Sequence, residues 1–184
     1  DRVIHHALCN VIEPLFEKNF IYDSYANRRG KGTLKAVERF KYFKKKVTRN
    51  LTIPAFVLKA DVRHYFEGVD HAILLSSLQR KIKDRRVIWL IRTILGNYST
   101  RAGNGMPLGN LTSQFFANVY LNELDHFVKH ILRAKYYLRY VDDFVILSNS
   151  RIELESYLAM IHKFIRENLA LELHPTKSRI VQMH

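Results

Sequence analysis

The chain has 184 residues, of which 47% are hydrophobic, so it can bury a core as one domain or as one body with two lobes. Seven Gly and four Pro exclude a linker-rich or low-complexity chain. Thirty Lys and Arg face seventeen Asp and Glu, and the formal net charge is +13. We therefore expect a polyanionic partner, with nucleic acid the first candidate and an anionic membrane the second.

Cys9 is the only cysteine, which excludes an internal disulfide and a zinc site built on several cysteines. We predict a reducing, intracellular setting. No apolar run approaches the ~20 residues of a membrane span, and the chain opens on a charged, helix-like stretch that does not resemble a signal peptide. The resulting prediction is a cytoplasmic protein without a membrane partner. Asp1 is not a natural start, so we expect further residues before it.

The N-terminal third combines two predicted helices with a basic loop and one strand. Residues 1–18 carry apolar side chains at helical spacing, and Pro14 ends or bends that helix. RRGKG at 28–32 is a basic loop with two glycines. Residues 33–48 are predicted as a helix. Its apolar side consists of Leu34, Val37, Phe40 and Phe43. The apolar run at 54–61 is a buried strand that ends in an acid.

The remaining elements alternate irregularly. Helices are predicted at 70–80 and 84–95, and a loop at 103–110 follows them. A long helix over 111–134 comes next, which Thr112 or Asn110 could cap. The last predicted elements are a strand hairpin at 136–148, a helix at 150–169 and a tail with strand character at 172–181. This order favours an α+β class in which helices cover a sheet.

Two adjacent aspartates, Asp142 and Asp143, lie between the apolar, β-rich runs of YYLRYVDDFVILS. A tight turn is the ordinary explanation of an Asp pair. However, the stretch from Val141 to Phe144 lacks the Gly or Asn that a two-residue hairpin prefers. Two like charges at a strand tip cost energy unless a cation binds them, and Mg²⁺ prefers carboxylates together with substrate phosphates. The pair is therefore a candidate metal site.

Asp61 can complete such a site, because it ends the apolar strand FVLKAD. Neighbouring strands that each end in an acid can converge on one edge of a sheet. Two metal ions about 4 Å apart can then activate a 3′-hydroxyl and stabilise departing pyrophosphate. Taken alone, Asp61 is equally compatible with a helix cap or a salt bridge.

Several ordered blocks, which span almost the whole chain, resemble the reverse transcriptase family. The fingers blocks are DRVIHHALCNVIEPLFEKNF and SYANRRGKGTLKAV, which are similar to those of group II intron-like bacterial enzymes. LKADVRHYFEGVDH resembles the first palm motif, and GMPLGNLTSQFFANVYLNELDHFV resembles the template-and-nucleotide motif. YVDD matches the family's hallmark box, and LELHPTKSRI resembles the next palm block. A lone YVDD is a weak signal, whereas several blocks in the right order are specific.

The resemblance implies an α+β right-hand polymerase fold, in which an antiparallel palm sheet packs on helices. Residues 1–50 would form the fingers, with part of 80–110 returning to them, and residues 51–184 would form the palm. The family's primer-gripping turn and thumb would follow position 184, so we expect the thumb to be absent from this stretch.

The implied activity is that of an RNA-directed DNA polymerase, which adds dNTPs to a primer 3′-OH on an RNA template by two-metal nucleotidyl transfer. Two Mg²⁺ ions are the expected cofactors, and Mn²⁺ is the expected substitute. The expected partners are an RNA template, a DNA or RNA primer and dNTPs, with a basic accessory protein as a possible addition. The expected location is bacterial or archaeal cytoplasm, with a phage genome as an alternative source.

The roles carried over from the family begin with the acids. Asp61 and Asp142 match the principal metal ligands, and Asp143 matches a third, more supportive carboxylate. Lys177 matches a lysine suggested to protonate pyrophosphate. The alternative for Lys177 is a solvated surface lysine.

Further residues match positions that contact the incoming nucleotide. Tyr65 falls where the family keeps an aromatic that blocks a 2′-hydroxyl, and Phe66, which fits core packing as the second member of the pair, is the alternative. Arg28 and Lys31 match the fingers motif that grips the triphosphate. An Arg fork suits phosphate oxygens, and the flanking glycines allow close approach. The alternative for both residues is a basic surface loop.

The template motif from Pro107 to Gln114 departs from the group II intron pattern. Those enzymes usually carry Gln-Gly and end the block in Ser-Pro, whereas this chain has Leu108-Gly109 and Ser113-Gln114. This version resembles the enzymes of diversity-generating retroelements, and it implies that Leu108, Gly109 and Gln114 lie near the incoming nucleotide. A group II intron-like or defence-associated bacterial enzyme is the alternative within the family.

Two other classes of function stay open. One is a catalytically weak nucleic-acid-binding fragment, against which the intact trio of Asp61, Asp142 and Asp143 argues. The other is an RNA-templated RNA polymerase, which also uses paired aspartates. Tyr65 as a sugar gate favours deoxynucleotides over that alternative.

Overall fold

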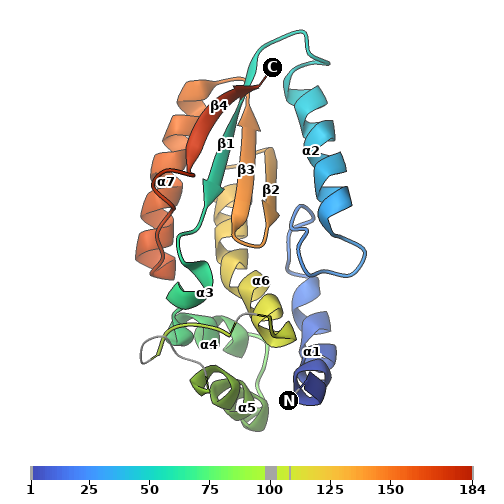
Figure 1. Cartoon of the computed structure of the whole chain (residues 1–184), viewed down its shortest axis with the longest axis vertical. Helices are drawn as coiled ribbons and strands as arrows, with labels where there is room; N and C mark the ends of the chain where they lie inside the picture. The colour runs from blue at the N-terminus through green and yellow to red at the C-terminus, as the bar shows by residue number, and fades with distance from the viewer. Residues whose placement is uncertain (1, 98–102, 108, 184) are drawn as a thin grey trace.

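A four-stranded antiparallel sheet lies at the centre of the computed structural model, which describes residues 2–97, 103–107 and 109–183 (Figure 1). The strands are β1 (Ala55–Asp61), β2 (Tyr136–Tyr140), β3 (Asp143–Ser148) and β4 (Arg179–Met183). Their order across the sheet is β2-β3-β1-β4. Strand β1 is therefore central, and it pairs with β3 on one side and with β4 on the other.

Seven α-helices and one π-helix surround the sheet in the described part of the chain. They are α1 (Arg2–Glu17), α2 (Thr33–Val47), α3 (Tyr65–Gly68), α4 (His71–Gln79), α5 (Arg85–Gly96), α6 (Leu111–His126), the π-helix η1 (Phe127–Ile131) and α7 (Arg151–Leu169). The predicted α+β class with an antiparallel sheet packed on helices is confirmed. Within the described residues, no helix has the length and apolar content that crossing a membrane requires.

The boundaries differ from the predicted ones at two helices. Helix α1 runs through Pro14 to Glu17 without ending at the proline. The helix predicted over 111–134 is α-helical only to His126, after which it continues as η1. Asn110 occupies the N-cap position of α6 without a side-chain cap bond. The Thr112 hydroxyl is hydrogen-bonded to His5 at 2.8 Å and caps nothing.

The two faces of the sheet are covered by different helices, because successive strand residues point to opposite faces. One face packs on the larger core, which is formed mainly by α1, α4, α5, α6 and α7. Leu58 and Ala60 of β1 and Phe144 and Ile146 of β3 point into this core. The other face packs on α2 through a smaller cluster, to which Val57 of β1 contributes.

Helix α2 buries only part of the predicted apolar side. Leu34 is 72% exposed and Val37 is 45% exposed. Phe43 packs against the sheet and Phe40 against the same cluster, as predicted, whereas Ala36 and Val47 take the places expected of the other two. The sequence carries apolar residues around much of this helix, and only one side can meet the sheet. The small Ala36 lets the helix approach the strands closely, which a pattern of hydrophobicity alone does not reveal.

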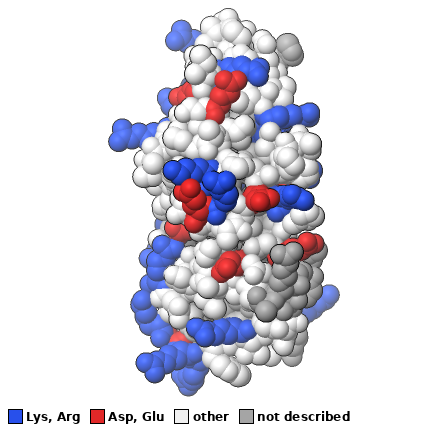
Figure 2. Space-filling model, turned by 90° about the vertical axis from the view of Figure 1, so that its left-hand side faces the viewer, with Lys and Arg blue, Asp and Glu red and all other residues white. Residues whose placement is uncertain are grey.

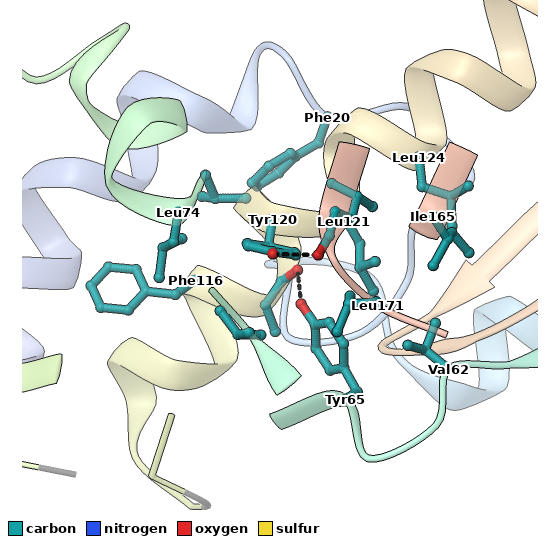
Figure 3. Packing of buried hydrophobic residues seen from close by; sticks show 14 of the residues in the cluster. Phe20, Val62, Tyr65, Leu74, Phe116, Tyr120, Leu121, Leu124, Ile165 and Leu171 are labelled. Atoms are coloured by element: carbon teal, nitrogen blue, oxygen red, sulfur yellow. Dashed lines mark hydrogen bonds between the residues drawn. The ribbon is translucent and has the colours of Figure 1, made fainter. Parts of the chain in front are cut away.

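Two buried tyrosines tie helices together inside the larger core (Figure 3). The Tyr65 hydroxyl donates to the carbonyl oxygen of Ala117 at 2.9 Å, which joins α3 to α6. The Tyr120 hydroxyl donates to the carbonyl oxygen of Leu169 at 2.6 Å, which joins α6 to the end of α7. Gly68 is the last residue of α3 and lies close to this core, where an added Cβ would be 2.8 Å from Leu171 Cδ2. These contacts fix the segment that follows Asp61.

Candidate metal centre

Three carboxylates meet at one edge of the sheet, as the sequence led us to expect. Asp61 is the last residue of β1 and is directly opposed to Asp143, the first residue of β3. Opposed residues of an antiparallel pair point to the same face with Cβ atoms roughly 5 Å apart. Asp142 lies in the β2–β3 turn immediately before Asp143. Asp61 and Asp142, which are 81 positions apart, thus lie at one acidic edge. This edge belongs to the same sheet face that packs against α2 nearer the other end of the strands.

Burial and neighbouring negative charges raise the pKa values of two aspartates at this edge. Burial raises the pKa of Asp142, and the charges of Asp143 and Asp61 raise it further. Burial and then the charge of Asp61 raise the pKa of Asp143. Lys177 partly offsets both shifts. Like charges that repel in this way favour binding of a cation.

The positively charged ammonium group of Lys177 lies at this acidic edge. Its Nζ lies 2.8 Å from Asp61 Oδ2. The hydrogen bond to Asp61 and then the charge of that carboxylate raise the pKa of Lys177. The side chain is 60% exposed, so the ammonium group also faces solvent at the acidic edge.

His174 organises the turn that carries Lys177. The backbone N–H of His174 donates to the Asp61 carbonyl at 2.7 Å, which fixes this turn to the end of β1. The His174 Nδ1 accepts from the backbone N–H groups of Thr176 and Lys177, both at 3.3 Å. The imidazole therefore acts as an acceptor at Nδ1. No local pattern in the sequence singles out His174, because its role depends on a contact 113 positions away.

Hard carboxylate oxygens are the donors that Mg²⁺ and Mn²⁺ prefer. Asp61, Asp142 and Asp143 therefore fit these ions by donor type. Among the described residues, however, no three His, Cys, Asp or Glu side chains converge on one point. Asp61 is directed toward Lys177. Binding of a metal ion by all three acids would require Asp61 to exchange Lys177 for the ion.

The turn between β2 and β3 is strained. Val141 has a φ of 56°, a left-handed conformation that is a true outlier for a β-branched residue. Such a conformation costs about 1–3 kcal/mol and persists only where surrounding contacts enforce it. Here the contact is a hydrogen bond from the Arg139 guanidinium to the Val141 carbonyl at 2.7 Å.

Arg139 is fully buried and uses its whole guanidinium group. Its side chain and that of Asp125 are each 0% exposed, and they form a bidentate ion pair through contacts of 2.8 and 2.7 Å. Further bonds reach Asn118, Ser24 and the Val141 carbonyl. Burial alone would lower the pKa of Arg139, but Asp125 raises it overall. Sequence reasoning missed this network, although charged residues inside apolar runs are a warning of buried pairs.

Arg28 differs from its predicted role, because its guanidinium is occupied by protein groups. The side chain is 6% exposed and binds Glu17 at 2.6 Å. It also donates to the carbonyl oxygens of Ile21 and Ser24, at 2.7 and 2.9 Å. Arg28 thus fixes the loop between α1 and α2. Lys31 is half-buried, and its Nζ donates to the Tyr22 carbonyl at 2.8 Å and lies 3.5 Å from the Tyr22 ring centroid.

The predicted sugar gate also lies elsewhere than expected. Tyr65 is 2% exposed, and its hydroxyl is bound to Ala117 within the core (Figure 3). Phe66 packs against the Tyr65 ring and remains partly exposed. The sequence favours core packing for the second residue of this pair. The short helix α3 reverses the order, because it turns the first residue inward.

The template motif is anchored to the same region. The backbone N–H of Met106 donates to the Phe66 carbonyl at 2.7 Å, and that of Gly105 donates to the Val69 carbonyl at 2.9 Å. Gly109 has a φ of 87°, which only glycine adopts readily. Gln114 lies half-buried in the first turn of α6. Leu108 lies outside the described residues.

Comparison with known proteins decides the family. The profile of the family "Reverse transcriptase (RNA-dependent DNA polymerase)" matches residues 1–184. The chain belongs to this family. Protein YkfC of Escherichia coli (strain K12) is similar to this reverse transcriptase domain, with 24% identity over 218 residues, covering 98% of this chain and 57% of YkfC. Group II intron-encoded protein LtrA of Lactococcus lactis subsp. cremoris is 28% identical over 134 residues, covering 70% of this chain and 21% of LtrA. The domain thus spans little more than half of the first relative and about a fifth of the second.

Solved structures support the fold of the reverse transcriptase domain independently of sequence. Apo telomerase from Candida tropicalis superimposes with a TM-score of 0.72 at 13% identity. The match covers 98% of this chain and 37% of the telomerase chain. The predicted right-hand polymerase architecture and the group II intron-like bacterial resemblance are confirmed. The finer resemblance to diversity-generating retroelement enzymes stays a prediction.

We expect Arg139→Met to destabilise the domain by about 3–5 kcal/mol, because it leaves Asp125 buried without its partner. Urea denaturation measures the loss. The matched control is Arg151→Met, which removes an exposed partner of Glu155 and should cost less than about 1 kcal/mol. Equal effects of the two substitutions would contradict a special role of the buried pair.

We expect Asp142→Asn to stabilise the domain at pH 7 by up to about 1 kcal/mol. The folded state raises the pKa of Asp142, so ionisation of this group opposes folding. That penalty is absent below the unfolded pKa of about 3.9 and grows as the pH rises through the folded value. The gain in thermal stability should therefore shrink as the pH falls from 7 toward 4. Asp84→Asn is the control of opposite sign, since hydrogen bonds lower the pKa of Asp84, and a gain there would contradict the electrostatic explanation.

Proposed function

We propose that this domain is the catalytic core of an RNA-directed DNA polymerase that adds dNTPs to a primer 3′-OH on an RNA template. The observation that carries the proposal is the acidic edge, where the register of β1 and β3 opposes Asp61 to Asp143 beside Asp142. Membership of the reverse transcriptase family supports the reaction class. Since the domain spans only part of its relatives, the activity of the whole protein is part of this proposal.

Asp61 and Asp142 are the proposed ligands of two Mg²⁺ ions, with Asp143 in support and Mn²⁺ as a substitute. The bound ions supply Lewis-acid activation of the 3′-hydroxyl and neutralise charge on the leaving pyrophosphate. The raised pKa values of Asp142 and Asp143 mean that these carboxylates hold protons more tightly than usual. Metal affinity is therefore expected to fall as the pH is lowered, because ligands must be deprotonated.

Lys177 is the proposed proton donor. In nucleotidyl transfer the 3′-hydroxyl loses its proton to solvent, its oxygen bonds to the α-phosphorus, and the bond from that phosphorus to the bridging oxygen of pyrophosphate breaks. Lys177 carries a proton at Nζ beside Asp61, and its raised pKa keeps it charged at neutral pH. It can deliver that proton to the leaving pyrophosphate, which stabilises the departing charge.

The nucleotide-binding side of the site extends from the acidic edge to the fingers. Lys31, on the exposed loop before α2, is the proposed contact of the triphosphate. Arg28 supports that loop from within. Gly109 and Gln114 border the proposed site of base pairing together with Leu108. We assign residues 1–50 to the fingers, with part of 80–110, and residues 51–184 to the palm.

The proposed partners follow from the reaction. They are an RNA template, a DNA or RNA primer and dNTPs, and the net charge of +13 suits such polyanions. The Leu108 and Gln114 pattern favours a diversity-generating retroelement enzyme. The intron-encoded LtrA favours a group II intron-like enzyme. Bacterial cytoplasm and a basic accessory protein complete the proposal.

Single-nucleotide addition to a primer annealed to RNA tests the reaction without demanding processive synthesis. Asp61→Asn and Asp142→Asn should each lower the Mg²⁺-dependent rate by at least about 100-fold, because each removes transition-state charge stabilisation. Lys177→Met should slow the rate by roughly 10–100-fold. The matched control is Glu167→Gln on the exposed surface of α7, which should leave the rate unchanged.

The same assay separates the competing classes of function. Equal rates for the wild type and Asp142→Asn, with RNA binding retained, would make the domain a binding module. Faster incorporation of rNTPs than of dNTPs by the wild type would make it an RNA-templated RNA polymerase.

The partly exposed Phe66, in place of the buried Tyr65, is the proposed gate against a 2′-hydroxyl. Phe66→Ala should therefore raise the efficiency of rNTP incorporation relative to dNTP by at least about 10-fold, because it removes the steric obstacle. Tyr65→Phe retains the ring and removes only the bond to Ala117. It should leave the ratio unchanged, and the opposite pattern would restore Tyr65 as the gate.

A further inference from the structure

Helix α5 presents an aromatic and basic surface that the polymerase site does not use. Trp89 is 66% exposed, which is unusual for so large an apolar side chain. Arg85 lies one turn before it and Arg92 one turn after it, so the three side chains share one side of the helix. All three line a hollow of about 450 Å³, together with Lys83.

The hollow has an apolar base and a basic rim. Ile82 and Ile88 line it and are otherwise buried in the core. Among the described residues that line it, none is acidic. The neighbouring Asp84 caps α5 and pairs with Arg86 at 3.4 Å, so its charge is already engaged. The described residues provide no ion-pair partner for Arg85 or Arg92.

The position of this surface sets it apart from the acidic edge. Figure 1 places α5 at the lower end of the molecule, beyond α4 and on the side toward which the β2–β3 turn points. In Figure 2, Lys and Arg side chains gather along the lower left edge, at the height of α5 in Figure 1. A strand that leaves the acidic edge in that direction would meet a basic surface.

The chemistry of the surface fits an unpaired nucleic-acid strand. Exposed aromatic rings stack on bases, and flanking guanidinium groups bind phosphates with a planar fork. A duplex hides the faces of its bases, so it cannot use Trp89 in this way. The carboxylates of an acidic protein partner would satisfy the arginines, but they would not stack on the exposed indole between them, whereas every nucleotide carries both a phosphate and a base. Charge and shape together therefore favour a single strand.

We propose that Arg85, Trp89 and Arg92 form a second binding site for single-stranded RNA, in which a base stacks on Trp89 and its neighbouring phosphates bind the two arginines. The site would hold unpaired RNA away from the acidic edge. This proposal rests on the proposed function in one respect, because the expected template of that function is an RNA strand.

Trp89 is the only tryptophan of the chain, so its fluorescence reports directly on this site. Titration of the 184-residue chain with an unstructured oligo(U) of about ten nucleotides should quench that fluorescence and saturate. Arg85→Ala/Arg92→Ala should weaken binding by about 10-fold. It should also reduce the slope of log affinity against log salt by roughly 0.7 for each phosphate that the variant no longer neutralises. Lys163→Ala/Arg166→Ala on the exposed surface of α7 removes the same charge and should change neither value.

The outcomes are decisive in both directions. A blunt-ended RNA duplex of equal length should cause little quenching. Asp142→Asn should quench like the wild type, so that loss of polymerase activity and loss of this site can be told apart. Absence of quenching by oligo(U), equal effects of the two double variants, or equal quenching by duplex RNA would each overturn the proposal. Quenching by an acidic peptide but not by oligo(U) would assign the surface to a protein partner.

Discussion

The buried pair of Arg139 and Asp125 is the interaction on which the rest of the site depends. Five hydrogen bonds from one guanidinium connect β2, α6, the segment before α2 and the β2–β3 turn. The Tyr137 hydroxyl also donates to Asp125 at 2.7 Å. A buried ion pair is weak support for stability, since its desolvation offsets most of its attraction. Its value here is geometric, because from inside the core it holds the partly exposed β2–β3 turn in one conformation.

That geometric constraint explains how an unfavourable site persists. Val141 adopts a strained backbone, and the adjacent acids sit where burial and like charge raise their pKa values. Both features cost folding free energy, and the bond from Arg139 to the Val141 carbonyl enforces the turn. Lys177 neutralises part of the charge from the opposite direction. The acidic edge therefore lowers the free energy of unfolding, and the packing of the helices in the larger core offsets this loss.

The sequence predicted those parts of the site that depend on a local pattern of residues. Apolar runs ending in Asp61 and flanking Asp142 predicted the strands, and their convergence required only that the strands be neighbours. The sequence did not predict correctly which of two similar neighbouring residues is buried. Tyr65 and Phe66 exchange their predicted places because α3 turns inward. Arg28 binds Glu17 and two carbonyl groups, and the sequence of an irregular loop does not show that its backbone will fold around the guanidinium. Helix α2 likewise has apolar residues on more than one side, and only packing selects among them.

Strand β4 has a consequence for the order in which the sheet is completed. Strand β4 covers the free edge of β1, and Lys177, which precedes β4, meets Asp61 across 116 positions of sequence. During synthesis from the N-terminus, the backbone groups on this edge of β1 therefore stay unpaired until β4 has been made, a condition that favours association with other chains. Contacts of such long separation also slow folding. A nascent chain of this domain would thus depend on protection until its closing strand has emerged from the ribosome.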